Sequence, residues 1–196
     1  MSAPPTIEQL LEHKAAGNEA YKAKEYQTAI DAYAKALKGM PLYDDDEDED
    51  DAPKGPPLDP ELLKQAAVVL CNRAACFMAI NKPIPANADA LRAAGFDSTN
   101  WKSHWRTGVS LMMMAPRLER SEQAIKAFEL TLACPTLPAS EQQNAKEALN
   151  RAKYRLEQGK DALDMPGGPE AHVTPCLPRH LATFATLPPL PPCHLC

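Results

Sequence analysis

Hydrophobic positions in the first forty residues recur with the spacing of α-helices. Thr6 and Gln9 fit a capping box, in which two side chains satisfy free backbone amides, so a helix is predicted from Thr6 to about Lys24. A second helix is predicted over about 25–39, because its apolar positions share one helical face: Ala29, Ile30, Tyr33, Ala36 and Leu37. Two antiparallel helices need small residues where they cross, and this pair carries them at Gly17, Ala20, Ala29 and Ala36.

A second helical pair follows an interruption. Asp59 fits a helix cap and Pro60 fits a first helical turn, which predicts a helix over about 59–80. A shorter helix is predicted over about 85–94, with Pro83 in the turn before it, because proline would break a helix interior.

A third pair is predicted over about 100–115 and 121–134, joined by a lengthened turn around residues 116–119. The last helix, about 140–163, carries an apolar stripe at Ala145, Leu149, Ala152 and Leu156. Such a stripe can cover the outer face of the third pair, which the terminal unit of a stacked array requires.

These elements predict an all-α domain over residues 6–163. Its parts are repeat 1 (about 6–41), repeat 2 (about 59–97), repeat 3 (about 100–134) and a capping helix (about 140–163). The insert 42–58 holds eight consecutive acidic residues, and the tail 164–196 is rich in proline. We expect neither segment to fold, because like charges repel and neither composition builds a core. The insert fits a solvated spacer, a competitor for nearby cations or an attractor of a basic partner.

Charge is distributed unevenly along the 196 residues. The net charge is −5, but the acidic run contributes −8, so the remainder carries +3. That is too little for the basic stripe of a nucleic-acid binder, and no apolar run reaches the length of about eighteen residues typical of a membrane span. The first residues lack the features of a signal peptide, and two of the cysteines lie inside predicted helices. We therefore expect a cytoplasmic protein that binds neither nucleic acid nor membrane. We also expect a monomer, because a capped stack of helices has no need to self-associate.

Five polar residues stand at spacings that would bring them together. Asn72 and Arg106 lie 34 residues apart, which is one period of a helix–turn–helix repeat that stacks into a curved solenoid. Lys14 and Asn18 are four residues apart, as are Lys102 and Arg106, so each pair shares one helix face. Three cations and two amides directed at one point suit a carboxylate, because charged donors and N–H groups offset its desolvation.

The body of the chain resembles a tetratricopeptide-repeat (TPR) domain of the co-chaperone, carboxylate-clamp type. The resemblance implies a right-handed α-solenoid of three TPR repeats plus a C-terminal capping helix. In that family a Lys/Asn pair, an asparagine in an Asn-Arg-Ala run and a Lys/Arg pair bind the acidic Glu-Glu-Val-Asp tails of Hsp90 and Hsp70. The matching residues, called the clamp below, are Lys14, Asn18, Asn72, Lys102 and Arg106. The acidic insert and the lengthened turn depart from the family's pattern.

Alternatives stay open for the clamp and for its surroundings. The cations also fit ordinary surface residues of a general TPR scaffold that serves a non-chaperone complex. Trp105, Met112 and Met113 lie one or two turns apart on the predicted fifth helix. They fit either an apolar wall for the ligand residue that precedes the acidic end, or a simple core stripe.

No residue pattern indicates catalysis. The histidines are scattered, and the sequence has neither a Gly-rich phosphate loop nor a paired-carboxylate signature, so we expect an adaptor without enzyme activity or cofactor. A regulatory fragment of an enzyme is a more distant alternative. The run Cys193-His194-Leu195-Cys196 only weakly matches a metal site or a prenylation box, and we expect neither.

Overall fold

The computed structural model describes residues 4–40 and 58–164, and every regular element within those two ranges is an α-helix. In chain order the helices are α1 (Ile7–Lys22), α2 (Tyr26–Ala36), α3 (Pro60–Ala79), α4 (Pro83–Phe96), α5 (Trp101–Met113), α6 (Leu118–Ala133) and α7 (Ala139–Asp164). Nearly all of the acidic insert and the whole tail beyond residue 164 lie outside the described residues, so the expectations for them stay predictions.

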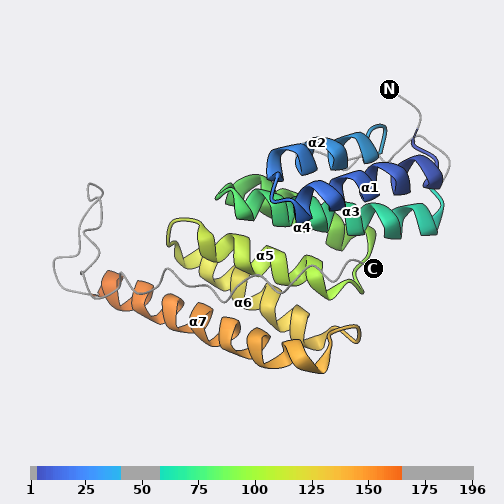
Figure 1. The fold of residues 1–196 in the computed structure, drawn as a ribbon. Helices are drawn as coiled ribbons and strands as arrows, with labels where there is room; N and C mark the ends of the chain where they lie inside the picture. The colour runs from blue at the N-terminus through green and yellow to red at the C-terminus, as the bar shows by residue number, and fades with distance from the viewer. Residues whose placement is uncertain (1–3, 41–57, 165–196) are drawn as a thin grey trace, which may run out of the picture.

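The helices pair in chain order, and the pairs stack. Helix α1 packs on α2, α3 on α4 and α5 on α6, while α3 also contacts α1, α2 and α5. Helix α7 packs mainly on α6 and closes the stack, which Figure 1 shows running from α2 and α1 at the top to α7 along the lower edge. The predicted fold class is confirmed: an all-α, right-handed solenoid of three helix–turn–helix repeats with a capping helix.

Glycines allow the closest helix contacts in the first and third repeats. A Cβ atom on Gly17 would lie 2.4 Å from Cε1 of Tyr33, and one on Gly108 would lie 2.5 Å from Cε1 of Phe128. Side-chain atoms cannot approach to such distances, so each aromatic ring lies against a helix backbone that only glycine leaves open. The small residues expected at the crossing of α1 and α2 therefore have a direct steric role.

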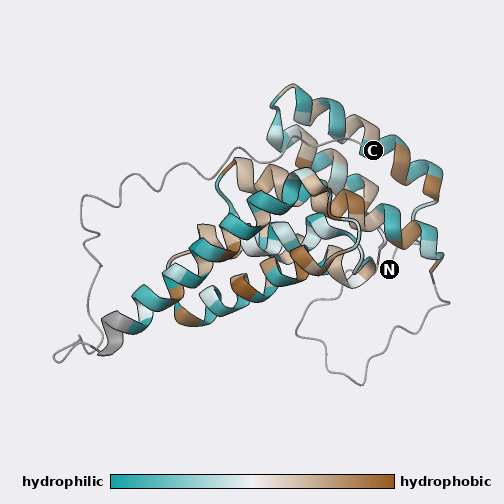
Figure 2. Cartoon of the chain, turned by 90° about the horizontal axis from the view of Figure 1, so that it is seen from below, coloured by the Kyte–Doolittle hydropathy of each residue, from teal (hydrophilic) through white to brown (hydrophobic). Residues whose placement is uncertain are grey.

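Helix α3 lies at the centre of the hydrophobic core. It contributes buried residues both to the cluster shared with α1 and α2 and to the cluster that extends to α7. Among the described helices, α3 alone is long and apolar enough to cross a membrane, but 61% of its apolar window is buried inside the stack, as the central helix of a packed solenoid requires. Figure 2 shows the hydrophilic and hydrophobic residues on different faces of the helices.

A buried ion pair links α3 to α4. The Nε and Nη2 groups of Arg73 donate to the two carboxylate oxygens of Asp89, each at 2.7 Å. The two side chains are 13% and 3% exposed. This bidentate geometry offsets much of the free-energy cost of removing both charges from water. Because Arg73 follows Asn72 in the chain, the ion pair anchors the turn of α3 that carries a clamp residue.

Two helices begin earlier than the sequence predicted. Helix α4 begins at Pro83 rather than near Pro85, and α6 begins at Leu118 rather than near Ser121. The amides of a first helical turn have no partner within the helix, so both prolines of α4 are tolerated there. The connection after α5 consists of residues 114–117, and part of the predicted lengthened turn is helical.

Candidate carboxylate-binding site

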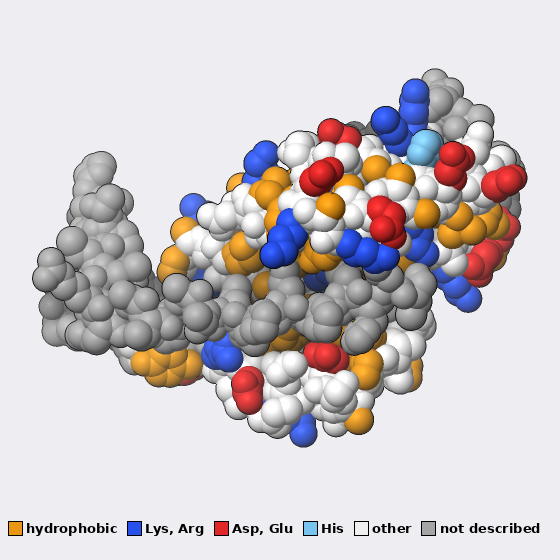
Figure 3. Space-filling view, in the orientation of Figure 1, with side chains coloured by type: hydrophobic (Ala, Val, Ile, Leu, Met, Phe, Trp, Pro, Cys, Tyr) orange, Lys and Arg blue, Asp and Glu red, His pale blue; other side chains and the backbone are white. Residues whose placement is uncertain are grey.

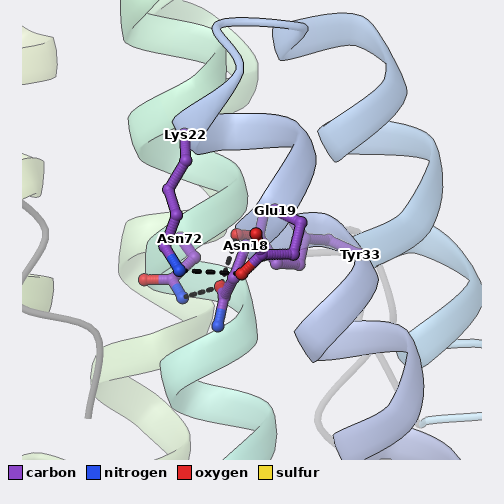
Figure 4. A network of polar contacts seen from close by, with 5 residues as sticks. All are labelled: Asn18, Glu19, Lys22, Tyr33 and Asn72. Carbon is purple, nitrogen blue, oxygen red and sulfur yellow. Dashed lines mark hydrogen bonds and ion pairs between the residues drawn. The ribbon is translucent and has the colours of Figure 1, made fainter.

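Two clamp asparagines meet between α1 and α3, although 54 positions separate them in the chain. The Nδ2 group of Asn72 donates to Oδ1 of Asn18 at 3.2 Å, and the hydroxyl of Tyr33 donates to the same oxygen at 2.7 Å. Figure 4 shows the three side chains converging from α3, α1 and α2, with the amide nitrogen of Asn18 turned away from both donors. That nitrogen is therefore oriented to donate elsewhere, for example to a ligand.

Lys14 lies one helical turn before Asn18 and is also tied to α3. The residue is 9% exposed, and its Nζ donates to Oε1 of Gln65 at 3.1 Å. Gln65 in turn donates through Nε2 to Oε1 of Glu61 at 2.8 Å. Because Glu61 accepts that bond, the amide of Gln65 is oriented with its oxygen toward Lys14. This chain of hydrogen bonds holds the ammonium group beside α3.

The two cations of α5 act on the same stretch of α3. Arg106 is 6% exposed and Lys102 is half-buried. Burial raises the pKa of the Cys71 thiol, whereas the charge of Arg106, a hydrogen bond from Arg106 and the charge of Lys102 oppose that rise. The hydrogen bond places the Arg106 guanidinium at Cys71, the residue that precedes Asn72, and the charge of Lys102 acts on the same thiol from α5.

Helix α3 is thus the common neighbour of all five clamp residues. It bears Asn72, contacts the Lys14 and Asn18 side chains from α1, and lies beside the two cations from α5. The set combines three positive charges with directional amide donors, which is the chemistry that binds a carboxylate. Within residues 4–40 and 58–164, no group of three His, Cys, Asp or Glu side chains is placed to hold a metal ion.

The apolar candidates on α5 take two different positions. Trp105 is 6% exposed, and its ring centroid lies 5.5 Å from that of Phe128, so the structure places Trp105 in the core. Met112 and Met113 are half-buried against the same core cluster, at the C-terminal end of α5. Nη1 of Arg155 on α7 donates to the backbone carbonyl of Met112 at 2.8 Å, which fixes the capping helix to this end. Contact between the two methionines and a ligand stays a prediction.

Two further residues belong to the site's surroundings. Gln65 lies seven positions, or about two helical turns, before Asn72, so spacing alone would have placed both on one face of α3. Tyr33 belongs to the apolar face predicted for the second helix, and its 1% exposure confirms that this position is buried. The contact of its hydroxyl with Asn18 depends on how closely α2 approaches α1, which residue spacing does not specify.

Charged side chains of both signs are interspersed on the face that Figure 3 displays. On that face Lys and Arg do not merge into one continuous basic stripe among the described residues. This face therefore does not present the broad basic field that attracts polyanions.

Comparison with known proteins identifies the fold. No protein-family model matches the sequence, and none of the curated proteins matches it. The TPR domain of Arabidopsis OM64 matches with a TM-score of 0.54 and 24% identity, over 75% of this chain and 96% of that domain. The Sgt2 TPR domain from Aspergillus fumigatus matches with a TM-score of 0.57 and 23% identity, over 89% of this chain and 93% of that one.

A third match is the first TPR domain of Spaghetti (RPAP3), solved with the HSP90 peptide SRMEEVD. Its TM-score is 0.58 at 20% identity, over 80% of this chain and 99% of that domain. The chain therefore has the tetratricopeptide-repeat fold. The TM-scores of 0.54–0.58 establish the arrangement of the helices, and at 20–24% identity these matches show the fold alone.

Proposed function

We propose that this protein is a cytoplasmic co-chaperone adaptor that binds the acidic C-terminal tail of Hsp90, Hsp70 or both. The observation that carries the proposal is the hydrogen bond between Asn72 and Asn18, which joins two clamp residues across α1 and α3. In this proposal the protein works by binding alone, without a cofactor, and acts as a monomer.

The chemistry of a chain end that finishes in aspartate explains the composition of the clamp. Its backbone and side-chain carboxylates lie close together, and desolvating both is costly unless each is paired and hydrogen-bonded. Lys14 and Lys102 would supply charge, and Arg106 would donate two parallel bonds to one carboxylate, which a lysine cannot do. Asn18 would contribute a directional N–H donor through its outward amide nitrogen.

A general TPR scaffold for a non-chaperone complex is the alternative function. In that case a peptide would contact other surfaces, and the clamp cations would contribute no more to its affinity than other surface cations do. The two functions differ in one respect that can be measured: only the clamp makes the affinity for an acidic tail depend on particular cations.

Fluorescence polarisation with labelled SRMEEVD tests the proposal. Lys102→Ala and Arg106→Ala each remove a charge-assisted hydrogen bond, so each should raise the Kd about tenfold or more. Lys126→Ala removes an exposed charge on α6 and serves as the matched control, with an expected change below about twofold. Circular dichroism verifies that each variant is folded. Equal, small effects from all three substitutions would refute the clamp and favour the general scaffold.

A further inference from the structure

We infer that Tyr33 is a positioning residue of the clamp: together with the amide of Asn72, its hydroxyl holds the side-chain amide of Asn18 so that the nitrogen, not the oxygen, faces the ligand. This inference rests on the proposed function and adds to it the source of the clamp's preference for an acid over an amide. Tyr33 is 1% exposed and acts through Asn18 rather than by touching a peptide.

The hydrogen bonds define which way the Asn18 amide points. Its Oδ1 accepts from the Tyr33 hydroxyl at 2.7 Å and from Asn72 Nδ2 at 3.2 Å. Rotating the amide by half a turn would set its nitrogen against Asn72 Nδ2, donor against donor, and would oblige the Tyr33 hydroxyl to accept instead of donate. It would also direct the amide oxygen outward. An outward oxygen would repel a carboxylate but accept from the N–H of a carboxamide. The orientation of one amide therefore decides which chain end the site favours.

The third repeat shows that helix packing does not require the hydroxyl. There Phe128 lies against Gly108 in the way that Tyr33 lies against its glycine, at nearly the same distance. The residue after the glycine is Val109 in the third repeat but Asn18 in the first. A plain ring is thus sufficient for close packing, and the hydroxyl occurs in the repeat where an amide needs a donor.

Burial makes this contact specific. A buried hydroxyl is almost always hydrogen-bonded, because an unpaired one would lose its bonds to water. Tyr33 satisfies this requirement by donating to Asn18, whose own side chain is half-buried and reaches the surface. The hydroxyl thereby links the packed interior of the first repeat to the outward donor of the clamp.

The test compares Tyr33→Phe with the wild type for two forms of SRMEEVD, one with a free C-terminal carboxylate and one amidated. The quantity measured is the ratio of the two Kd values, by titration with labelled peptides. Tyr33→Phe keeps the ring on its glycine and should reduce the preference for the free acid by roughly threefold to tenfold, the worth of one hydrogen bond. Tyr26→Phe deletes a hydroxyl from the same helix and should leave the ratio unchanged.

A double-mutant cycle with Asn18→Ala separates positioning from general stability. If the hydroxyl acts through the amide, Tyr33→Phe has no further effect on the ratio once Asn18 is absent. A hydroxyl with a merely structural role would give the same change in both backgrounds, which would overturn the inference. A Tyr33→Phe protein that retains the full acid preference would also overturn it while leaving the proposed function intact. A wild type without any acid preference would instead refute the proposed function, and this inference with it.

Discussion

The buried pair of Arg73 and Asp89 permits a quantitative test of how α3 is held in place. Asp89→Ala would remove two hydrogen bonds of 2.7 Å and leave a guanidinium that is only 13% exposed without its counter-charge. Breaking a buried pair in this way lowers the free energy of unfolding by about 3–5 kcal/mol. For a chain of this size, that loss lowers the thermal midpoint by roughly 6–20 °C. Urea and thermal unfolding followed by circular dichroism measure both quantities.

Two further variants make this test specific. Asp31→Ala removes an exposed carboxylate from α2 and should change stability by less than about 0.5 kcal/mol. The double variant Arg73→Met with Asp89→Leu removes both charges and should recover most of the lost stability, because apolar residues can replace a buried ion pair. A loss below about 1 kcal/mol for Asp89→Ala would contradict the interpretation of the pair as the link that anchors α3 to α4.

Three other predictions address packing, the clamp and pH. Gly17→Ala should lower the free energy of unfolding, measured in urea, by about 1–3 kcal/mol, because the new methyl would lie 2.4 Å from a buried ring. Gly95→Ala is the control, since its methyl would enter open space and should not destabilise the protein. Equal effects of the two substitutions would contradict the packing argument. Gln65→Ala removes one hydrogen bond that orients Lys14 and should raise the Kd for SRMEEVD by about threefold, and an unchanged Kd would show that the clamp does not depend on this bond. Burial raises the pKa of the Cys71 thiol, so the folded state retains this proton longer than the unfolded state does. Stability from this source is complete below the ordinary thiol pKa and is lost as the pH rises through the raised one, so Cys71→Ala should show a smaller alkaline decline in unfolding free energy than the wild type.

Local sequence signals were sufficient to predict the number, order and pairing of the helices in residues 4–40 and 58–164. The capping box at Thr6 and Gln9 is present in the structure, as is the Asp59 cap of α3. Helical periodicity and small residues at the crossings predicted which faces pack. These features depend on neighbours within a few residues, which is the range over which a sequence pattern carries direct physical information.

Helix starts were less well predicted where two local rules compete. Pro83 and Pro85 both signal a break, yet a first turn tolerates proline because its amides are unpaired within the helix. The buried residues Ala86 and Ala90 lie inside the helix with either start, so the apolar pattern does not distinguish the two. The spacing of the prolines does not distinguish them either, because both prolines fit a turn and a first helical turn equally well.

For the site, as for the helices, the sequence predicted the features that depend on residue spacing but not those that depend on contacts between helices. A repeat period placed Asn72 and Arg106 in equivalent positions, and the contact between α1 and α3 was implied by stacking. The roles of Tyr33 and Gln65 could not be predicted from the sequence, because each depends on the distance between side chains of two different helices. Spacing alone allows Trp105 a ligand-facing or a core position; the structure buries its ring against Phe128, and any contact with a ligand stays a prediction.

Calorimetric titration of the wild-type protein with free-acid and amidated SRMEEVD, at matched ionic strength, tests the central claim most directly. The claim is that three cations and two amides from α1, α3 and α5 hold the carboxylate of a chain end. We expect amidation to weaken binding by about tenfold or more, since it removes one charge-assisted set of hydrogen bonds. Equal affinity for the two peptides would contradict it.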